Sequence, residues 1–155
     1  MNSKIKAIIF DLDGLLIDSE PTWHKAYEIF LKNHRVVYNP EVYERMIGRG
    51  LKENMKIARD ELGVDGEIDD LLHEIRSIFY SLLARKEHLL MPGALDLLQK
   101  ISSYKLAVAT GGHNREKCSQ ILKDIGVEKY FDVVVSSDDV KVGKSAPGVY
   151  LETAR

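Results

Sequence analysis

Three short runs of apolar and β-branched residues limit the folds open to this chain. They span Ala7–Phe10, Leu106–Ala109 and Val133–Val135, and each reads as a buried strand. Helical patterns follow over Ala94–Ile101 and Arg115–Ile125. Strands that alternate with helices form parallel sheets, because parallel neighbours need a crossover connection. The sequence therefore predicts an α/β fold with a parallel sheet of three strands.

The interval between the first two runs, about residues 20–90, has helical patterns and no convincing strand. A first helix opens at Ser19, its predicted N-cap, with a proline in the first turn. A second ends at Gly63, and a third runs from about Ile68 to His88. Met91-Pro92-Gly93 then ends the helical part. The pattern predicts two modules: an all-helical insert of residues 16–92, and an α/β domain of residues 1–15 and 93–155.

The composition is that of a soluble globular protein, with 155 residues, 45% of them hydrophobic and 30% charged. The formal net charge of −2 gives no electrostatic reason to expect nucleic acid or a membrane as a partner. The single cysteine, Cys118, excludes a disulfide within the chain and is predicted to be an inert, half-buried thiol. The apolar run near the N-terminus stops at Asp11, too short for a signal peptide, so we expect a cytoplasmic protein.

Polar residues stand at the carboxyl ends of all three predicted strands. These are Asp11 and Asp13, then Thr110-Gly111-Gly112, then Ser136–Asp139, with Lys144 shortly after. Two carboxylates close together are costly unless a cation or a reaction needs them. Because ligands of α/β sheets bind at this edge, we expect the groups to converge on one point.

This set of groups suits phosphoryl transfer through an aspartyl intermediate. A carboxylate is ionised at neutral pH, but it needs positive charge nearby before it can attack a phosphate dianion. Mg²⁺ with oxygen ligands, a hydroxyl, backbone N–H groups and a lysine can share that task. The second aspartate can protonate the leaving oxygen and then activate water.

The segments DLDGLLIDSEP, AVATGG and GKSAP, in that order, resemble the first three motifs of the haloacid dehalogenase superfamily. The likeness is greatest to its sugar-phosphatase and β-phosphoglucomutase branch, and it implies a Rossmann-like sheet with an inserted helical cap domain. It implies Asp11 as the nucleophile and Asp13 as the general acid/base. It further implies that Thr110 and Gly111 bind phosphate and that Lys144 balances charge. Mg²⁺ is the implied cofactor, with Asp11 and Asp13 as its ligands.

The chain also departs from the family pattern. Ser145 and Gly148 stand where relatives commonly have proline and aspartate. The family's fourth motif is a strand ending in an acidic pair that supplies a Mg²⁺ ligand, and the sequence stops at Arg155, before it. We therefore expect a truncated sheet with Ala7–Phe10 as an edge strand, open to self-association, and weak Mg²⁺ binding.

Some polar residues have two interpretations. Arg49 and Lys52, in the helical module, are candidates for substrate binding, and a solvated helix start explains them equally well. Asp138 and Asp139 are expected to serve a turn rather than to replace a metal ligand. His113 is expected to face solvent rather than to act in catalysis.

The predicted function is hydrolysis of a small phosphomonoester, with sugar phosphates as the expected class, through an aspartyl-phosphate intermediate. The predicted partner is a small phosphorylated metabolite. A phosphomutase of the β-phosphoglucomutase type is the alternative among enzymes, since it uses the same intermediate and returns the phosphoryl group to the sugar. A truncated, catalytically inactive relative that acts as a binding module is the alternative from another class.

Overall fold

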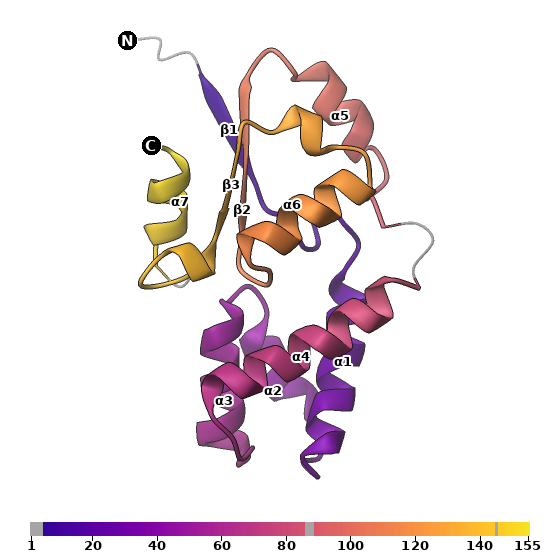
Figure 1. Ribbon diagram of the computed structural model, residues 1–155, viewed down its shortest axis with the longest axis vertical. Helices are drawn as coiled ribbons and strands as arrows, with labels where there is room; N and C mark the ends of the chain where they lie inside the picture. Colours follow the sequence, from indigo (N-terminus) through magenta and orange to yellow (C-terminus); the bar gives the residue numbers. More distant parts are fainter. Residues whose placement is uncertain (1–4, 86–88, 145) are drawn as a thin grey trace. The chain divides into compact units, whose positions relative to one another are not determined.

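The structure is a computed structural model that describes residues 5–85, 89–144 and 146–155. The chain forms two compact units, one of Met1–Asp18 with Leu89–Arg155 and one of Ser19–His88 (Figure 1). Ser145 and the end of the third predicted helix, residues 86–88, fall outside the described residues.

The first unit contains a parallel sheet with the strand order β1-β2-β3. Strand β1 is Ala7–Phe10, β2 is Lys105–Thr110 and β3 is Val133–Ser136. Thr110 and Ser136, the last residues of β2 and β3, are paired across the sheet. The predicted α/β class is confirmed, and each predicted strand lies within the observed one.

Helices cover both faces of this sheet. Helices α5 (Ala94–Lys100) and α6 (Arg115–Asp124) lie on one side, and α7 (Gly148–Thr153) lies on the other (Figure 1). Two short 3₁₀ helices, Glu128–Tyr130 and Ser137–Asp139, precede and follow β3. Because the strands are parallel, their carboxyl ends and the loops that follow them meet at one edge of the unit.

The central and edge strands differ in burial. All residues of β2 from Leu106 to Thr110 are buried, whereas in β1 only Phe10 is buried. The prediction that β1 is an edge of the three described strands is confirmed. The expectation that β1 is a buried strand holds only for its end, because Phe10 is buried, Ile8 and Ile9 are half-buried and Ala7 is exposed to solvent.

The boundary between the two units lies a few residues inside the predicted helical insert. Met91 N donates a hydrogen bond to Leu16 O at 2.9 Å, and Asp18 N donates to Leu89 O at 2.8 Å. Leu16 and Ile17 are both buried. These hydrogen bonds tie the two crossing segments to each other, so the α/β unit extends to Asp18 and resumes at Leu89.

The second unit is helical, as predicted. Its helices are α1 (Glu20–Asn33), α2 (Pro40–Met46), α3 (Leu51–Leu62) and α4 (Ile68–Leu83). Helices α1 and α4 pack together, and the Trp23 ring stacks on the Phe79 ring with their centroids 3.7 Å apart. The buried core also contains Ala26, Tyr27, Phe30, Leu31, Leu51, Met55, Ala58, Leu71, Leu72 and Ile75.

The helix ends agree with the predictions in part. Gly63 ends α3 in the left-handed conformation, with φ 73°, as predicted. Ser19 occupies the N-cap of α1, but its side chain makes no capping hydrogen bond, because its backbone is already near the helical region (φ −99°, ψ −14°). Helix α4 ends at Leu83, earlier than predicted. No helix of the described residues is long and apolar enough to cross a lipid bilayer.

Candidate active site

Asp11 and Lys144 form an ion pair in the α/β unit. Lys144 Nζ lies 2.6 Å from Asp11 Oδ1, and Leu12 N donates a hydrogen bond to the same oxygen at 2.7 Å. Asp11 is the first residue after β1, and Lys144 belongs to the loop before α7. The Lys144 side chain is 7% exposed and the Asp11 side chain 40% exposed. A carboxylate that is open to solvent thus lies against a cation that is almost buried.

Asp13 lies in a tight turn directly after β1. Leu16 N and Ile17 N both donate to Leu12 O, each at 3.0 Å, and Gly14 N donates to Ile17 O at 2.8 Å. Gly14 has a φ of 71°, a left-handed conformation that glycine adopts without strain. The turn explains why a glycine follows the two aspartates in the sequence.

Thr110 ends β2 and is fully buried, and Gly111 beside it is also buried. Within the described residues, Thr110 Oγ1 has no hydrogen-bond partner. A buried hydroxyl without a partner costs roughly 1–3 kcal/mol. Ser137 Oγ, after β3, is in the same condition. These hydroxyls are therefore available to donate to the oxygen atoms of a ligand.

His113 is the residue whose environment the sequence did not indicate. It is fully buried, and its Nε2 lies 3.1 Å from Asp13 Oδ1. The prediction that His113 faces solvent is wrong, because the loop after β2 turns its ring toward the loop after β1. Its position three residues beyond Thr110, at the carboxyl end of a central strand, was the available signal.

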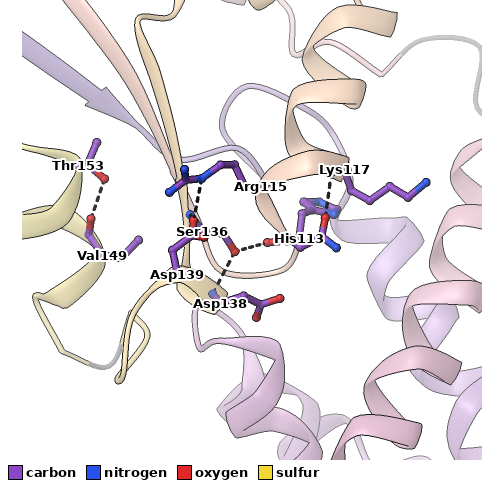
Figure 2. A network of polar contacts seen from close by, with 9 residues as sticks. His113, Arg115, Lys117, Ser136, Asp138, Asp139, Val149 and Thr153 are labelled. Atoms are coloured by element: carbon purple, nitrogen blue, oxygen red, sulfur yellow. Dashed lines mark hydrogen bonds and ion pairs between the residues drawn. The ribbon is translucent and has the colours of Figure 1, made fainter.

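A polar network joins the loop after β2 to the loop after β3 (Figure 2). Ser136 Oγ donates to His113 O at 2.5 Å and accepts a hydrogen bond from Asp138 N at 3.1 Å. Asp139 Oδ2 accepts from Ser136 N at 2.8 Å and from Arg115 Nε at 3.2 Å. Asp138 and Asp139 thus lie in a capped turn, as predicted.

The comparisons with known proteins agree with this geometry. The sequence pattern of the family described as haloacid dehalogenase-like hydrolase matches residues 8–155. The chain belongs to the family of haloacid dehalogenase-like hydrolases. The predicted family resemblance is confirmed.

Relatives of the chain include named phosphatases. The chain is 32% identical over 152 residues to a phosphorylated carbohydrates phosphatase of Thermotoga maritima, covering 95% of this chain and 68% of the relative. It is 32% identical to (DL)-glycerol-3-phosphatase 2 of Arabidopsis thaliana, covering 97% of this chain and 65% of that protein. The chain therefore spans about two thirds of the length of these relatives.

Solved structures share the fold. CbbY of Rhodobacter sphaeroides, in complex with xylulose-(1,5)bisphosphate, is 26% identical with a TM-score of 0.81, covering 98% of this chain and 72% of that one. The β-phosphoglucomutase of Clostridium difficile is 20% identical with a TM-score of 0.83, covering 97% and 70%. The second likeness is one of fold alone.

Two carboxylates, those of Asp11 and Asp13, stand close together in the sequence after β1 and are the predicted ligands of a metal ion. The side chain of Asp11 is 40% exposed and that of Asp13 is 13% exposed. Within the part of the chain that the structure describes, no three histidine, cysteine, aspartate or glutamate side chains gather around one point. Mg²⁺ is commonly bound through one or two carboxylates and keeps several waters, so this donor set fits Mg²⁺.

Cys118 of α6 lies near these carboxylates and is fully buried. Burial, together with the negative charges of Asp13 and Asp11, raises the pKa of its thiol to about 12. A thiol that stays protonated at neutral pH is a poor nucleophile. This agrees with the predicted inert thiol, although its burial is complete rather than partial.

Arg49 and Lys52 belong to the helical unit. Arg49 lies in the turn before α3, where its Nε donates to Arg45 O at 2.7 Å and its guanidinium pairs with Glu53. Lys52 is exposed in the first turn of α3. Their role in substrate binding stays a prediction.

Proposed function

We propose that this chain hydrolyses a small phosphomonoester, with phosphorylated carbohydrates or polyols as the substrate class, through an aspartyl phosphate on Asp11. The contact of 2.6 Å between Lys144 Nζ and Asp11 Oδ1 is the observation that carries the proposal. A phosphate dianion can approach a carboxylate whose charge is offset by a cation at contact distance. The names of the relatives, which act on phosphorylated carbohydrates and on glycerol phosphate, support the substrate class.

In the first step, a carboxylate oxygen of Asp11 attacks phosphorus, and the bond between phosphorus and the alcohol oxygen breaks. Lys144 offsets the negative charge that gathers around the reacting groups. The Thr110 hydroxyl and the Gly111 N–H donate hydrogen bonds to the phosphoryl oxygens. Asp13 gives its proton to the leaving oxygen, so the product departs as a neutral alcohol.

In the second step, water attacks the phosphorus of the aspartyl phosphate. Asp13, now ionised, takes a proton from that water. The bond between phosphorus and the Asp11 oxygen breaks, and inorganic phosphate leaves. Asp11 is again a carboxylate and Asp13 is again protonated, so the cycle closes.

Mg²⁺ is the proposed cofactor, with Asp11 and Asp13 as the residues that would hold it, Asp13 through an oxygen atom that does not carry its proton. When bound, it supplies positive charge close to the phosphoryl oxygens. Removal of divalent ions with a chelator is expected to abolish turnover, and added Mg²⁺ is expected to restore it.

Trapping the covalent intermediate tests the proposal. The protein is mixed with a sugar phosphate that is radiolabelled on phosphorus, and the reaction is quenched in acid. The label bound to the protein is then measured before and after treatment with hydroxylamine, which cleaves acyl phosphates. Wild-type protein should carry label that hydroxylamine releases, and Asp11→Asn should carry none. Asp124→Asn makes the same change at an exposed carboxylate at the end of α6 and should be labelled like wild type. Equal labelling of Asp11→Asn and wild type would refute the proposal.

Product analysis separates hydrolysis from the mutase alternative. A phosphatase releases free phosphate in proportion to the substrate consumed. A mutase instead returns an isomeric sugar phosphate and releases little phosphate. A chain that consumes no substrate in the presence of Mg²⁺ would favour the binding module.

A further inference from the structure

His113 is held in place by its backbone as well as by its ring. Its carbonyl oxygen accepts the hydrogen bond from Ser136 Oγ at 2.5 Å, and Ser136 is itself fully buried (Figure 2). The next residue, Asn114, is the N-cap of α6 and accepts from Lys117 N at 2.9 Å. The ring thus stands on a segment that β3 and α6 fix from two sides.

The ring reaches a carboxylate that has a task in the proposed reaction. His113 Nε2 lies 3.1 Å from Asp13 Oδ1, the His113 side chain is completely buried, and that of Asp13 is 13% exposed. As general acid, Asp13 carries its hydrogen on the oxygen that faces the leaving group, so Oδ1 is left as an acceptor and pairs with the tautomer of His113 that has its hydrogen on Nε2. Donation to one oxygen fixes the rotation of the carboxylate about its Cβ–Cγ bond.

A fixed carboxylate matters for proton transfer. A general acid acts only when its proton lies within hydrogen-bond distance of the leaving oxygen. A displacement of a catalytic group by about 1 Å lowers the rate on the order of 10²-fold. A neighbour that holds the acid in place therefore affects the rate without touching the substrate.

We propose that His113 is a positioning residue that orients Asp13 for proton transfer to the leaving group. The inference rests on the proposed function, because it assumes that Asp13 is the general acid. If His113 positions Asp13, the effect of replacing His113 should depend on how much the leaving group needs a proton. An alkoxide needs one, whereas a stabilised phenolate such as p-nitrophenolate does not.

The test compares two substrates, a polyol phosphate and p-nitrophenyl phosphate. In His113→Leu, which removes the donor, kcat/KM for the polyol phosphate should fall by about 10²-fold, because kcat/KM reports the transfer to Asp11 in which the leaving group takes the proton. With p-nitrophenyl phosphate, kcat/KM of this variant should stay within about 3-fold of wild type, because kcat/KM excludes the water-activating step that both substrates share. His113→Gln, which keeps an N–H donor, should recover most of the lost rate.

Three further variants keep the result decisive. Leu122→Ala removes a buried side chain of α6 outside the network, so it should change kcat/KM for the two substrates by the same factor. If His113→Leu does not fold, His113→Gln is compared with His113→Asn, whose shorter amide falls short of Asp13. In Asp13→Asn, kcat/KM should fall far more with the polyol phosphate than with the aryl phosphate, whereas kcat, which includes the water-activating step, should fall with both.

The outcomes separate the two proposals. If kcat/KM of Asp13→Asn falls equally with both substrates, Asp13 is not the general acid and the proposed function fails on that point. If Asp13→Asn is selective but His113→Leu is not, only the positioning role of His113 is refuted. Selectivity in Leu122→Ala would also refute it, because any loss of packing would then suffice.

Discussion

The Lys144 ammonium lies 2.6 Å from a carboxylate oxygen of Asp11, although one residue precedes α7 and the other follows β1. This contact sets the electrostatics of the proposed nucleophile. The two partners differ in exposure, since Lys144 is 7% exposed and Asp11 40% exposed. The protein therefore holds the cation in place and leaves the carboxylate accessible.

Lys144→Met keeps the length of the side chain and removes its charge. Turnover should fall by about 10²- to 10³-fold, as when one charge-stabilising group is lost from an active site. The measurement is kcat with a saturating sugar phosphate. Lys141→Met makes the same change at an exposed lysine of the same loop and should leave kcat unchanged. A Lys144→Met variant that keeps more than a tenth of the activity would contradict the assignment.

Thr110→Val removes the buried hydroxyl and keeps the shape of the side chain. Because Thr110 Oγ1 has no partner within the described residues, the free protein should be as stable as wild type or more stable. Binding of inorganic phosphate should weaken by about 10-fold, which calorimetry can measure. Thr153→Val is the matched control. It removes the donation of Thr153 Oγ1 to Val149 O at 2.6 Å within α7, so it should lower stability and leave phosphate binding intact.

Asp132 links β2 to the segment before β3, and its stabilising effect should depend on pH. Hydrogen bonds from Leu106 N and from Lys105 Nζ, at 3.0 and 3.1 Å, lower the pKa of the Asp132 carboxyl in the folded protein. A carboxyl whose pKa is lower in the folded protein than in the unfolded chain stabilises the fold at pH values above its unfolded pKa. This stabilisation is lost as the pH falls through the pKa of the folded protein. Asp132→Asn should therefore be less stable than wild type at pH 7, and the difference should shrink below about pH 4.

Urea unfolding of both proteins over that pH range measures the effect. Lys105→Met provides a comparison, since it removes the cation but leaves the backbone donor, which is the larger cause of the lowered pKa. Its loss of stability at pH 7 should be smaller than that of Asp132→Asn. A difference between Asp132→Asn and wild type that is constant from pH 7 to below pH 4 would show that the charge of Asp132 is not involved.

The buried thiol gives a probe of folding. The pKa of the Cys118 thiol is raised to about 12, so little of it is thiolate at pH 8 in the native protein. A reagent that modifies cysteine thiolates should therefore react far more slowly with the native protein than with the unfolded chain. The rate should follow the unfolded fraction as urea is added. Fast labelling of Cys118 in the native protein would mean that α6 opens more readily than its packing indicates.

Local sequence was sufficient for most of the α/β unit. β1 matches its predicted bounds, and β2 and β3 contain the predicted segments. Short apolar runs between turn residues are typical of buried strands, so the local sequence was enough to locate them. Since the carboxyl ends of parallel strands lie at one edge, the groups that follow the strands were expected to converge, but the role of Lys144 rested on the family resemblance, because a loop lysine is by default exposed.

The limits of the units were less predictable. The extension of the α/β unit to Asp18 depends on hydrogen bonds between residues 16–18 and 89–91, which are far apart in the sequence. Likewise, Ser19 stands at the predicted N-cap, but its backbone conformation prevents the expected capping hydrogen bond. Neither the hydrogen bonds between distant segments nor the backbone conformation of Ser19 can be predicted from the local sequence pattern.

His113 marks the division between the two kinds of information. The sequence determined that it follows a strand and precedes a helix, which is equally typical of an exposed loop residue. Only the tertiary structure decided that it is buried, because the pairing of β1 with β2 and the bond from Ser136 Oγ to its carbonyl oxygen turn its ring toward Asp13. A polar side chain takes its role from the partner it meets, and for His113 that partner lies on a distant segment of the chain.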